Sequence, residues 1–304
     1  MIIDIHSHLA YNKIFPAAFL AEVAESLGGK EEAQRQLISQ LVYNSLNDSD
    51  GSRFIKKMDE AGIDKSVLLI ADFGFALGEP ALCLEDIFLL HKRVLEAYPE
   101  RLMVFGGVDP RRGKAGADLF ERSVREYNFS GLKLYPPCGF ELDHPGLYPL
   151  YEICDQLNLP VLTHTGPSQR SMRTEQDYPK SILKVSREFR NVKFILAHAG
   201  ARDCETTIDV TKKRSNVYFD ISTFQVYFKD KGELDRQFRR FFDHSPEQII
   251  FGTDWPMFML SVTQKQLKKT VEDIDSISSA EKDLLFCKNA LEVLPENCLT
   301  TKTK

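Results

Sequence analysis

The feature that most constrains the fold is a series of short apolar segments that alternate with helical patterns. Most of these segments are continuously apolar, which is typical of strands covered on both faces. The expected strands are Ile2–His8, Ser66–Asp72, Leu102–Asp109, Gly131–Tyr135, Val161–His164, Lys193–His198, Val217–Ile221 and Ile249–Gly252.

The connections between most of these strands carry apolar residues at helical spacing. The expected helical faces lie within residues 87–98, 117–127, 147–154, 182–189 and 234–241. Eight strands that alternate with helices predict an α/β fold, the (β/α)8 or TIM barrel. An open, doubly wound sheet is the alternative that this pattern leaves open.

The connection between the first two strands is unusually long. It contains an extra helical segment, which we interpret as an insertion over residues 15–60. Loops of this length commonly have a function, so one hypothesis is a cap over the barrel mouth. The other is an ordinary extra helix on the outside. Since no linker rich in Pro, Gly or Ser interrupts the chain, we expect residues 1–304 to form a single domain.

Composition disfavours several classes of protein. The chain has 304 residues, 43% of them hydrophobic, which is enough for a large core. The net charge is −5 and no long run of like charge occurs, so we expect no nucleic-acid partner. No signal-peptide pattern and no run of about 18 apolar residues is present, so we expect no membrane partner. The six scattered cysteines favour a reducing compartment, and hence a cytoplasmic location.

Four of the seven histidines stand at the carboxyl ends of expected strands. They are His6 and His8 in IIDIHSH, His164 in PVLTHTG and His198 in FILAHAG. Asp254 in IIFGTDWP has the same position after the last strand. In a parallel barrel all these strand ends emerge on one face, where active sites of this fold lie. We therefore expect the five side chains to converge.

The residue types indicate a metal centre. His6 and His8 point the same way along a strand, with Ser7 between them turned away. Together with His164 and Asp254 they match the ligand set of one catalytic divalent ion. Zinc is our expectation, although manganese, iron or nickel also fits. Taken alone, a pair of histidines is a weak motif, and Asp254 has a helix N-cap as its alternative role.

The other histidines have different expected roles. His198 is either a fourth nitrogen ligand or a general acid/base beside the metal, and we favour the second. His91, His144 and His244 lie on expected helices or loops, and we interpret them as surface residues.

These motifs, in this order, resemble the amidohydrolase superfamily. The most similar part is its amidohydrolase-related branch (amidohydrolase 2), which includes aminocarboxymuconate-semialdehyde decarboxylase, resorcylate-type decarboxylases and several lactone or ester hydrolases. The resemblance runs from IIDIHSH through GLKLYPP, PVLTHTG, FILAHAG and IIFGTDWP to KNALEVL. It implies a mononuclear centre held by His6, His8, His164 and Asp254, with His198 as the neighbouring acid/base. Barrels of this branch are often dimers, so a homodimer is a further expectation.

The resemblance implies a metal-dependent hydrolase that acts on a small carbonyl substrate, namely a lactone, ester or amide. In that mechanism Asp254 takes a proton from the activated water, and His198 stabilises the developing charge or protonates the leaving group. The alternative is a lyase, a nonoxidative decarboxylase of a small carboxylic acid. A barrel that has lost activity and serves as a binding protein is a third hypothesis.

Four residues are candidates for contacts with the substrate. Lys133 in GLKLYPP lies where some superfamily members carry a carboxylated lysine that bridges two metals. In this branch the position usually does not bridge, so we expect Lys133 to bind a substrate anion or to be structural; a binuclear site is the alternative. Arg170 and Arg173, which follow His164, could pair with a carboxylate, or both could be solvated. Tyr135 is the fourth candidate, because it also lies near a strand end.

Overall fold

The eight expected strands form one parallel sheet in sequential order, β1 to β8. The computed structural model describes residues 1–28, 31–172, 181–201 and 204–296. The strands are β1 Ile3–Ser7, β2 Lys65–Leu69, β3 Leu102–Gly107, β4 Gly131–Leu134, β5 Val161–Thr163, β6 Phe194–Leu196, β7 Val217–Asp220 and β8 Ile249–Ile250. Every strand pairs with the next one along the chain, so the predicted alternation is confirmed.

Hydrogen bonds between the first strand and the segment around the last close the sheet into a barrel. The backbone N–H of Ile5 donates to the carbonyl of Phe251 at 3.0 Å, and that of Asp254 donates to the carbonyl of His6 at 2.8 Å. An open doubly wound sheet would leave these two edges far apart. The (β/α)8 barrel is therefore the observed fold.

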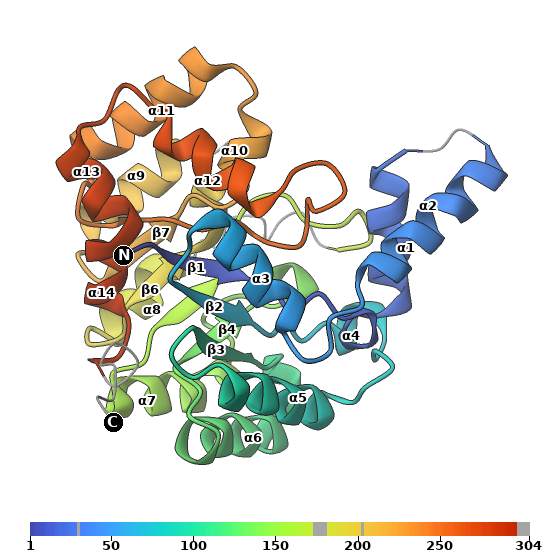
Figure 1. Cartoon of the computed structure of the whole chain (residues 1–304). Helices are drawn as coiled ribbons and strands as arrows, with labels where there is room; N and C mark the ends of the chain where they lie inside the picture. Colours follow the sequence, from blue (N-terminus) through green and yellow to red (C-terminus); the bar gives the residue numbers. More distant parts are fainter. Residues whose placement is uncertain (29–30, 173–180, 202–203, 297–304) are drawn as a thin grey trace.

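Helices surround the barrel (Figure 1). Their apolar faces pack on the outer faces of the strands, and the predicted helical faces fall on α5, α6, α7, α8 and α11. The helices are α1 Ala17–Ser26, α2 Glu32–Ser45, α3 Ser52–Ala61, α4 Gly74–Leu77, α5 Leu84–Ala97, α6 Gly113–Glu126, α7 Tyr148–Leu157, α8 Ile182–Glu188, α9 Cys204–Lys213, α10 Phe224–Tyr227, α11 Lys231–His244, α12 Gln264–Glu272, α13 Ser279–Asp283 and α14 Asn289–Val293.

The barrel interior is a second apolar layer. Alternate residues of the strands point inward, so Val67 and Leu69 pack there with Met103 and Phe105, and α14 covers the far end. On β4, Lys133 pairs with Gly107 of β3 on one side and with Leu162 of β5 on the other.

The long connection after β1 divides into two parts. Helices α1 and α2 lie side by side and project from the barrel, at the right of Figure 1. Helix α3 instead packs beside α12 and leads into β2, as the first helix of the barrel does in this fold. The inserted helical segment is thus the α1–α2 hairpin, which has a small core of its own around Ala24, Val42 and Leu46.

One of the three histidines expected on the surface is buried. His91 on α5 is fully buried, because it lies on the side of the helix that faces the barrel. Its Nδ1 donates to the carbonyl of Ile87 at 2.8 Å, so the ring finds a polar partner within its own helix. His244 is exposed and His144 is half-buried.

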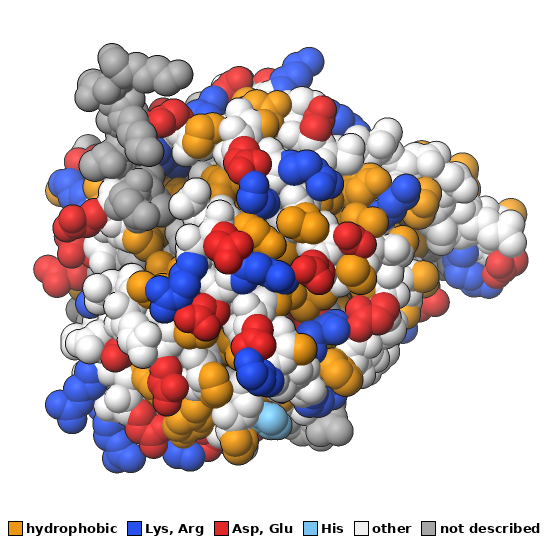
Figure 2. All heavy atoms as spheres, turned by 90° about the horizontal axis from the view of Figure 1, so that it is seen from below, with side chains coloured by type: hydrophobic (Ala, Val, Ile, Leu, Met, Phe, Trp, Pro, Cys, Tyr) orange, Lys and Arg blue, Asp and Glu red, His pale blue; other side chains and the backbone are white. Residues whose placement is uncertain are grey.

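Charged side chains of both signs are mixed on the surface that Figure 2 shows. On the face shown in Figure 2, Lys and Arg side chains are interspersed with Asp and Glu. Across the described ranges, no helix is both long enough and apolar enough to cross a lipid bilayer.

Candidate metal centre

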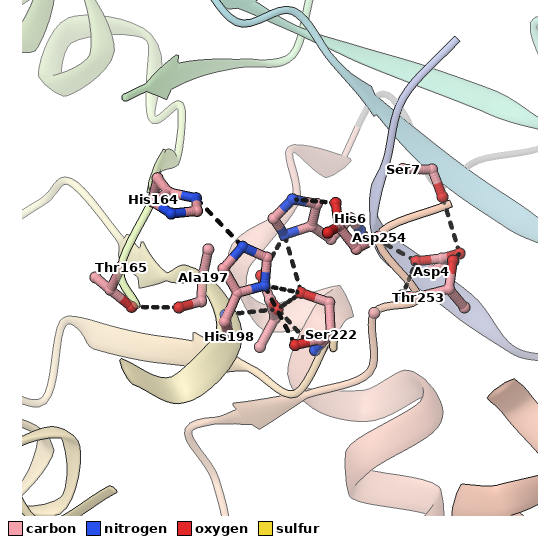
Figure 3. A network of polar contacts seen from close by, with 12 residues as sticks. Asp4, His6, Ser7, His164, Thr165, Ala197, His198, Ser222, Thr253 and Asp254 are labelled. Carbon is pink, nitrogen blue, oxygen red and sulfur yellow. Dashed lines mark hydrogen bonds and ion pairs between the residues drawn. The ribbon is translucent and has the colours of Figure 1, made fainter. Parts of the chain in front are cut away.

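The five side chains predicted to converge lie together at the carboxyl ends of the strands. Four of them, His6, His164, His198 and Asp254, lie around one small volume in Figure 3. His8 joins them, because its Nε2 lies 3.4 Å from Oδ1 of Asp254. The Nε2 of His6 lies at the same distance, 3.4 Å, from that oxygen.

An irregularity in β1 aims the two histidines at this volume. The pairing register between β1 and β2 shifts between Asp4 and Ser7. Ile5 packs inside the barrel, whereas Asp4 and Ser7 share a hydrogen bond of 2.9 Å on the other side. The shift of one residue brings His6 to the inner face directly after Ile5. Gly252 lies beneath His6, where an added Cβ would be only 3.0 Å from the Cβ of His6.

Hydrogen bonds orient His6 and His8 in the same way. The Nδ1 of His8 lies 2.8 Å from the carbonyl oxygen of Leu69, which can only accept, so Nδ1 carries the proton. The Nδ1 of His6 lies 2.9 Å from the buried carboxylate of Asp220. In both rings Nε2 is therefore left with a lone pair directed toward Asp254. A carboxylate behind a ligating imidazole is the usual arrangement at metal sites.

The other two histidines also have assignable protons. The Nδ1 of His198 lies 2.8 Å from Oγ and 3.2 Å from the carbonyl oxygen of Ser222, so it donates to this residue. The Nε2 of His198 faces Nδ1 of His164 at 3.3 Å, so Nδ1 of His164 is the donor. The Nε2 of His164 is buried and has no hydrogen-bond partner among the described groups. Its lone pair is available to a ligand.

Two of these residues adopt the left-handed backbone conformation, which is uncommon for residues other than glycine. His198 has a φ of 61° and Asp254 has a φ of 56°. Each such residue costs about 1–3 kcal/mol and persists only where surrounding structure imposes it. Strain of this kind clusters at functional sites, and here it turns both side chains into the barrel mouth.

The electrostatics favour neutral imidazoles at His6, His164 and His198 and an ionised carboxylate at Asp254 at neutral pH. Burial lowers the pKa of His6 to about 4, although the carboxylate of Asp220 opposes this change. Burial also lowers the pKa of His164 and of His198. Burial alone would raise the pKa of Asp254, but the neighbouring side chains of His8, His6 and His198 lower it to about 2. Neutral imidazole and ionised carboxylate are the forms that bind a metal.

Lys133 brings a positive charge to the same place. Its side chain is buried, and its Nζ has no hydrogen-bond partner among the described residues. Burial lowers the pKa of Lys133 to about 8, while the carboxylates of Asp220 and Asp254 favour the charged form. Tyr135 lies near it, with its ring 6.0 Å from Nζ, and stacks on the ring of His164 at 4.2 Å.

The four histidines, Asp254, Lys133 and Tyr135 all line one cavity, part of which is open to solvent. The remainder of the described wall is almost entirely apolar and includes side chains of the α1–α2 hairpin, such as Leu20, Val23 and Val42. The inserted hairpin therefore forms one side of the cavity.

The two predicted arginines are not part of this described wall. Arg170 is exposed on the loop after β5, and Arg173 lies outside the described residues. Of the groups that the structure adds to the prediction, Asp220 stands at the end of β7, where the strand-end rule could have found it. Ser222 and the apolar wall have no comparable signal in the sequence, because their roles depend on contacts across the barrel.

The donor set fits one divalent ion. The ligand atoms of His6, His8 and Asp254 lie within 4.8 Å of one another and face the cavity. His6, His198 and Asp220 form a second group within the same limit, but their facing atoms already serve as hydrogen-bond partners of one another or of Ser222. The first group is the better candidate. His164, the fourth predicted ligand, lines the same cavity, but it is not part of this group of mutually close ligand atoms.

Comparison with known proteins supports the same reading of the fold. An uncharacterised TIM-barrel protein from Bordetella bronchiseptica has a TM-score of 0.68 at 16% identity, covering 96% of this chain and 97% of its own. A probable 2-pyrone-4,6-dicarboxylic acid hydrolase from Acinetobacter baumannii has a TM-score of 0.63 at 16% identity, with 96% and 98% covered. A dihydroxybenzoic acid decarboxylase from a Polaromonas species, with bound manganese, has a TM-score of 0.64 at 16% identity, with 95% and 96% covered.

Identities this low establish the shared fold only. No curated protein matches the sequence. The model of the amidohydrolase family, however, matches residues 3–295, which is nearly the whole chain. Members of this family include metal-dependent hydrolases and decarboxylases that act on small molecules. The protein belongs to the amidohydrolase family.

Proposed function

We propose that the protein is a metal-dependent hydrolase of a small carbonyl compound, namely a lactone, an ester or an amide. The observation that carries this proposal is the convergence of the Nε2 atoms of His6 and His8 on one oxygen of Asp254, at the end of a cavity. His164 would complete the ligand set through its unpartnered Nε2. Nitrogen and oxygen ligands of this kind favour zinc, while manganese is the main alternative.

A divalent ion at this position would lower the pKa of water and polarise a substrate carbonyl. The residues of the chain supply the proton transfers. Asp254 is ionised and faces the ligand atoms, so it can accept the proton of the attacking water. His198 is held by Ser222 through Nδ1, so it would first have to take up at Nε2 the proton that Asp254 removes from the water, and it could then protonate the leaving group. The ammonium of Lys133 can hold an oxygen anion of the substrate.

A nonoxidative decarboxylase is the second candidate function. It is favoured by one observation, the buried and unpartnered ammonium of Lys133 next to the ligand atoms, which could hold a substrate carboxylate. Hydrolysis and decarboxylation differ in their products, so they can be separated by assay.

The test combines metal analysis with two variants. Protein purified without added metal should contain about one equivalent of divalent ion. His8→Ala should lose this ion, whereas His198→Ala should retain it and lose turnover. If His198→Ala also loses the ion, the assignment of ligands is wrong. A screen of lactones and esters against aromatic carboxylic acids, followed by pH change and carbon dioxide release, then decides between hydrolase and lyase.

A further inference from the structure

An aromatic wall leads from the metal centre to the inserted hairpin. The ring of Tyr135 stacks on His164 at 4.2 Å, and the ring of Phe73 meets Tyr135 at 5.0 Å. Phe19 of α1 stacks on Phe73 at 4.9 Å, and Phe15 stacks on Phe19 at 5.5 Å. All five rings line the cavity. The wall is therefore continuous from a candidate ligand to the helical insertion.

Apart from Ser45, the rest of the described cavity wall consists of apolar side chains. They come from the hairpin and from the loop after β8, and they are Leu20, Val23, Leu27, Val42, Leu46, Pro256, Met257, Phe258, Met259 and Leu260. Leu27 and Leu260 are 43% and 48% exposed, so the cavity opens to solvent between the hairpin and this loop. An apolar passage thus extends from the metal centre to the surface.

The charged and imidazole side chains of the described wall lie at the inner end of this passage. Among the described residues of the wall, Lys133 is the one ammonium, and it lies with the histidines and Asp254. Ser45 is the polar side chain that the hairpin contributes. A second anionic group on a ligand would meet apolar side chains, and its transfer from water would be unfavourable.

We propose that the substrate carries a single carbonyl or carboxyl head and an elongated apolar body that lies along the aromatic wall under the α1–α2 hairpin. This inference rests on the proposed function for the identity of the head group. It assigns the specificity of the site to the insertion, because Phe19, Leu20 and Val23 come from it. With the wall formed by the described residues, compact dianionic compounds should bind more weakly than elongated monoanions.

The test measures equilibrium binding to the zinc-loaded protein by calorimetry. The probes are butanoate, hexanoate, octanoate and decanoate, which share one head group and differ only in apolar length. Each added methylene that becomes buried should lower the Kd by up to about fourfold. Isophthalate, a compact dianion, should bind at least about tenfold more weakly than decanoate.

A matched pair of variants locates the binding site. Leu20→Gln places an amide in the cavity, so it should weaken decanoate and leave butanoate unchanged. Leu37→Gln makes the same change on α2 at a side chain that is 61% exposed, and it should alter neither ligand. If Leu20→Gln does not fold, the dependence of Kd on the chain length of the carboxylate in the unaltered protein still decides the question.

The outcomes separate this inference from the proposed function. A Kd that does not depend on chain length, or tighter binding of isophthalate, would overturn the inference. So would a chain-length dependence that is equal in Leu20→Gln and in the unaltered protein. Chain-length dependence without turnover of any ester, lactone or carboxylic acid would support the binding passage and contradict the proposed enzymatic activity.

Discussion

The carboxylate of Asp220 decides which nitrogen of His6 is free to bind a metal. Its Oδ2 accepts a hydrogen bond from Nδ1 of His6 at 2.9 Å, with the two side chains 0% and 1% exposed. Its Oδ1 accepts from the backbone N–H groups of Ser222 at 2.9 Å and His198 at 3.1 Å. In Asp220→Asn the amide oxygen can keep these backbone bonds. The amide NH2 group would then face Nδ1 and move the ring proton to Nε2, which blocks the ligand atom.

The expected loss of zinc affinity in Asp220→Asn follows from the removal of the hydrogen bond between His6 and the Asp220 carboxylate. A buried hydrogen bond to a charged group is worth about 1.5–3 kcal/mol, and mutation of the group that holds a ligating histidine typically lowers metal affinity by about 10–100-fold. These ranges agree, since 100-fold corresponds to about 2.7 kcal/mol. The assay is a titration of the apoprotein with zinc in competition with a chromogenic chelator.

Asp109→Asn is the matched control. Asp109 is also buried and follows a strand, β3, but its carboxylate pairs with Arg111 and does not line the cavity. The Asp109→Asn variant should therefore bind zinc as tightly as the unaltered protein. An unchanged zinc affinity in Asp220→Asn, measured on protein that unfolds at the normal temperature, would refute this account of His6.

Two further predictions concern acid stability and the floor of the site. Burial lowers the pKa of His91 from its ordinary 6.5 to about 4, so only the unfolded chain gains this proton between those pH values. The free energy of unfolding should therefore fall by about 3 kcal/mol on that account as the pH drops from 6.5 to 4. The measurement is urea denaturation at several pH values. The free energy of unfolding of His91→Leu should decline less steeply with falling pH than that of the unaltered protein, whereas the exposed control His244→Leu should decline normally. An equal pH dependence in the two variants would contradict the reasoning. Gly252→Ala places a Cβ 3.0 Å from the Cβ of His6, so it should displace the imidazole and lower the zinc affinity by about 10-fold or more, as the loss of a group that orients a ligating histidine does. Zinc affinity equal to that of the unaltered protein would show that His6 has room to adjust.

Much of the barrel could be predicted because its signal is local. Each strand is a short apolar run, such as Val217–Asp220, and each covering helix repeats apolar residues on one face, as α11 does. These patterns follow from burial on both faces of a strand and on one face of a helix, which depends little on distant neighbours. His91 was assigned to the surface wrongly because a helix position alone does not tell which side faces the core.

The sequence by itself determined that His6, His8, His164, His198 and Asp254 come together, because parallel strands deliver their carboxyl ends to one face of a barrel. It did not determine how each group is oriented. The shift in β1, the carboxylate of Asp220 behind His6 and the carbonyl of Leu69 behind His8 decide which nitrogen carries a proton. The aromatic wall from Tyr135 to the α1–α2 hairpin likewise joins residues distant in sequence. Such contacts exist only once the chain has folded, since they depend on packing across the barrel rather than on the spacing of residues along it.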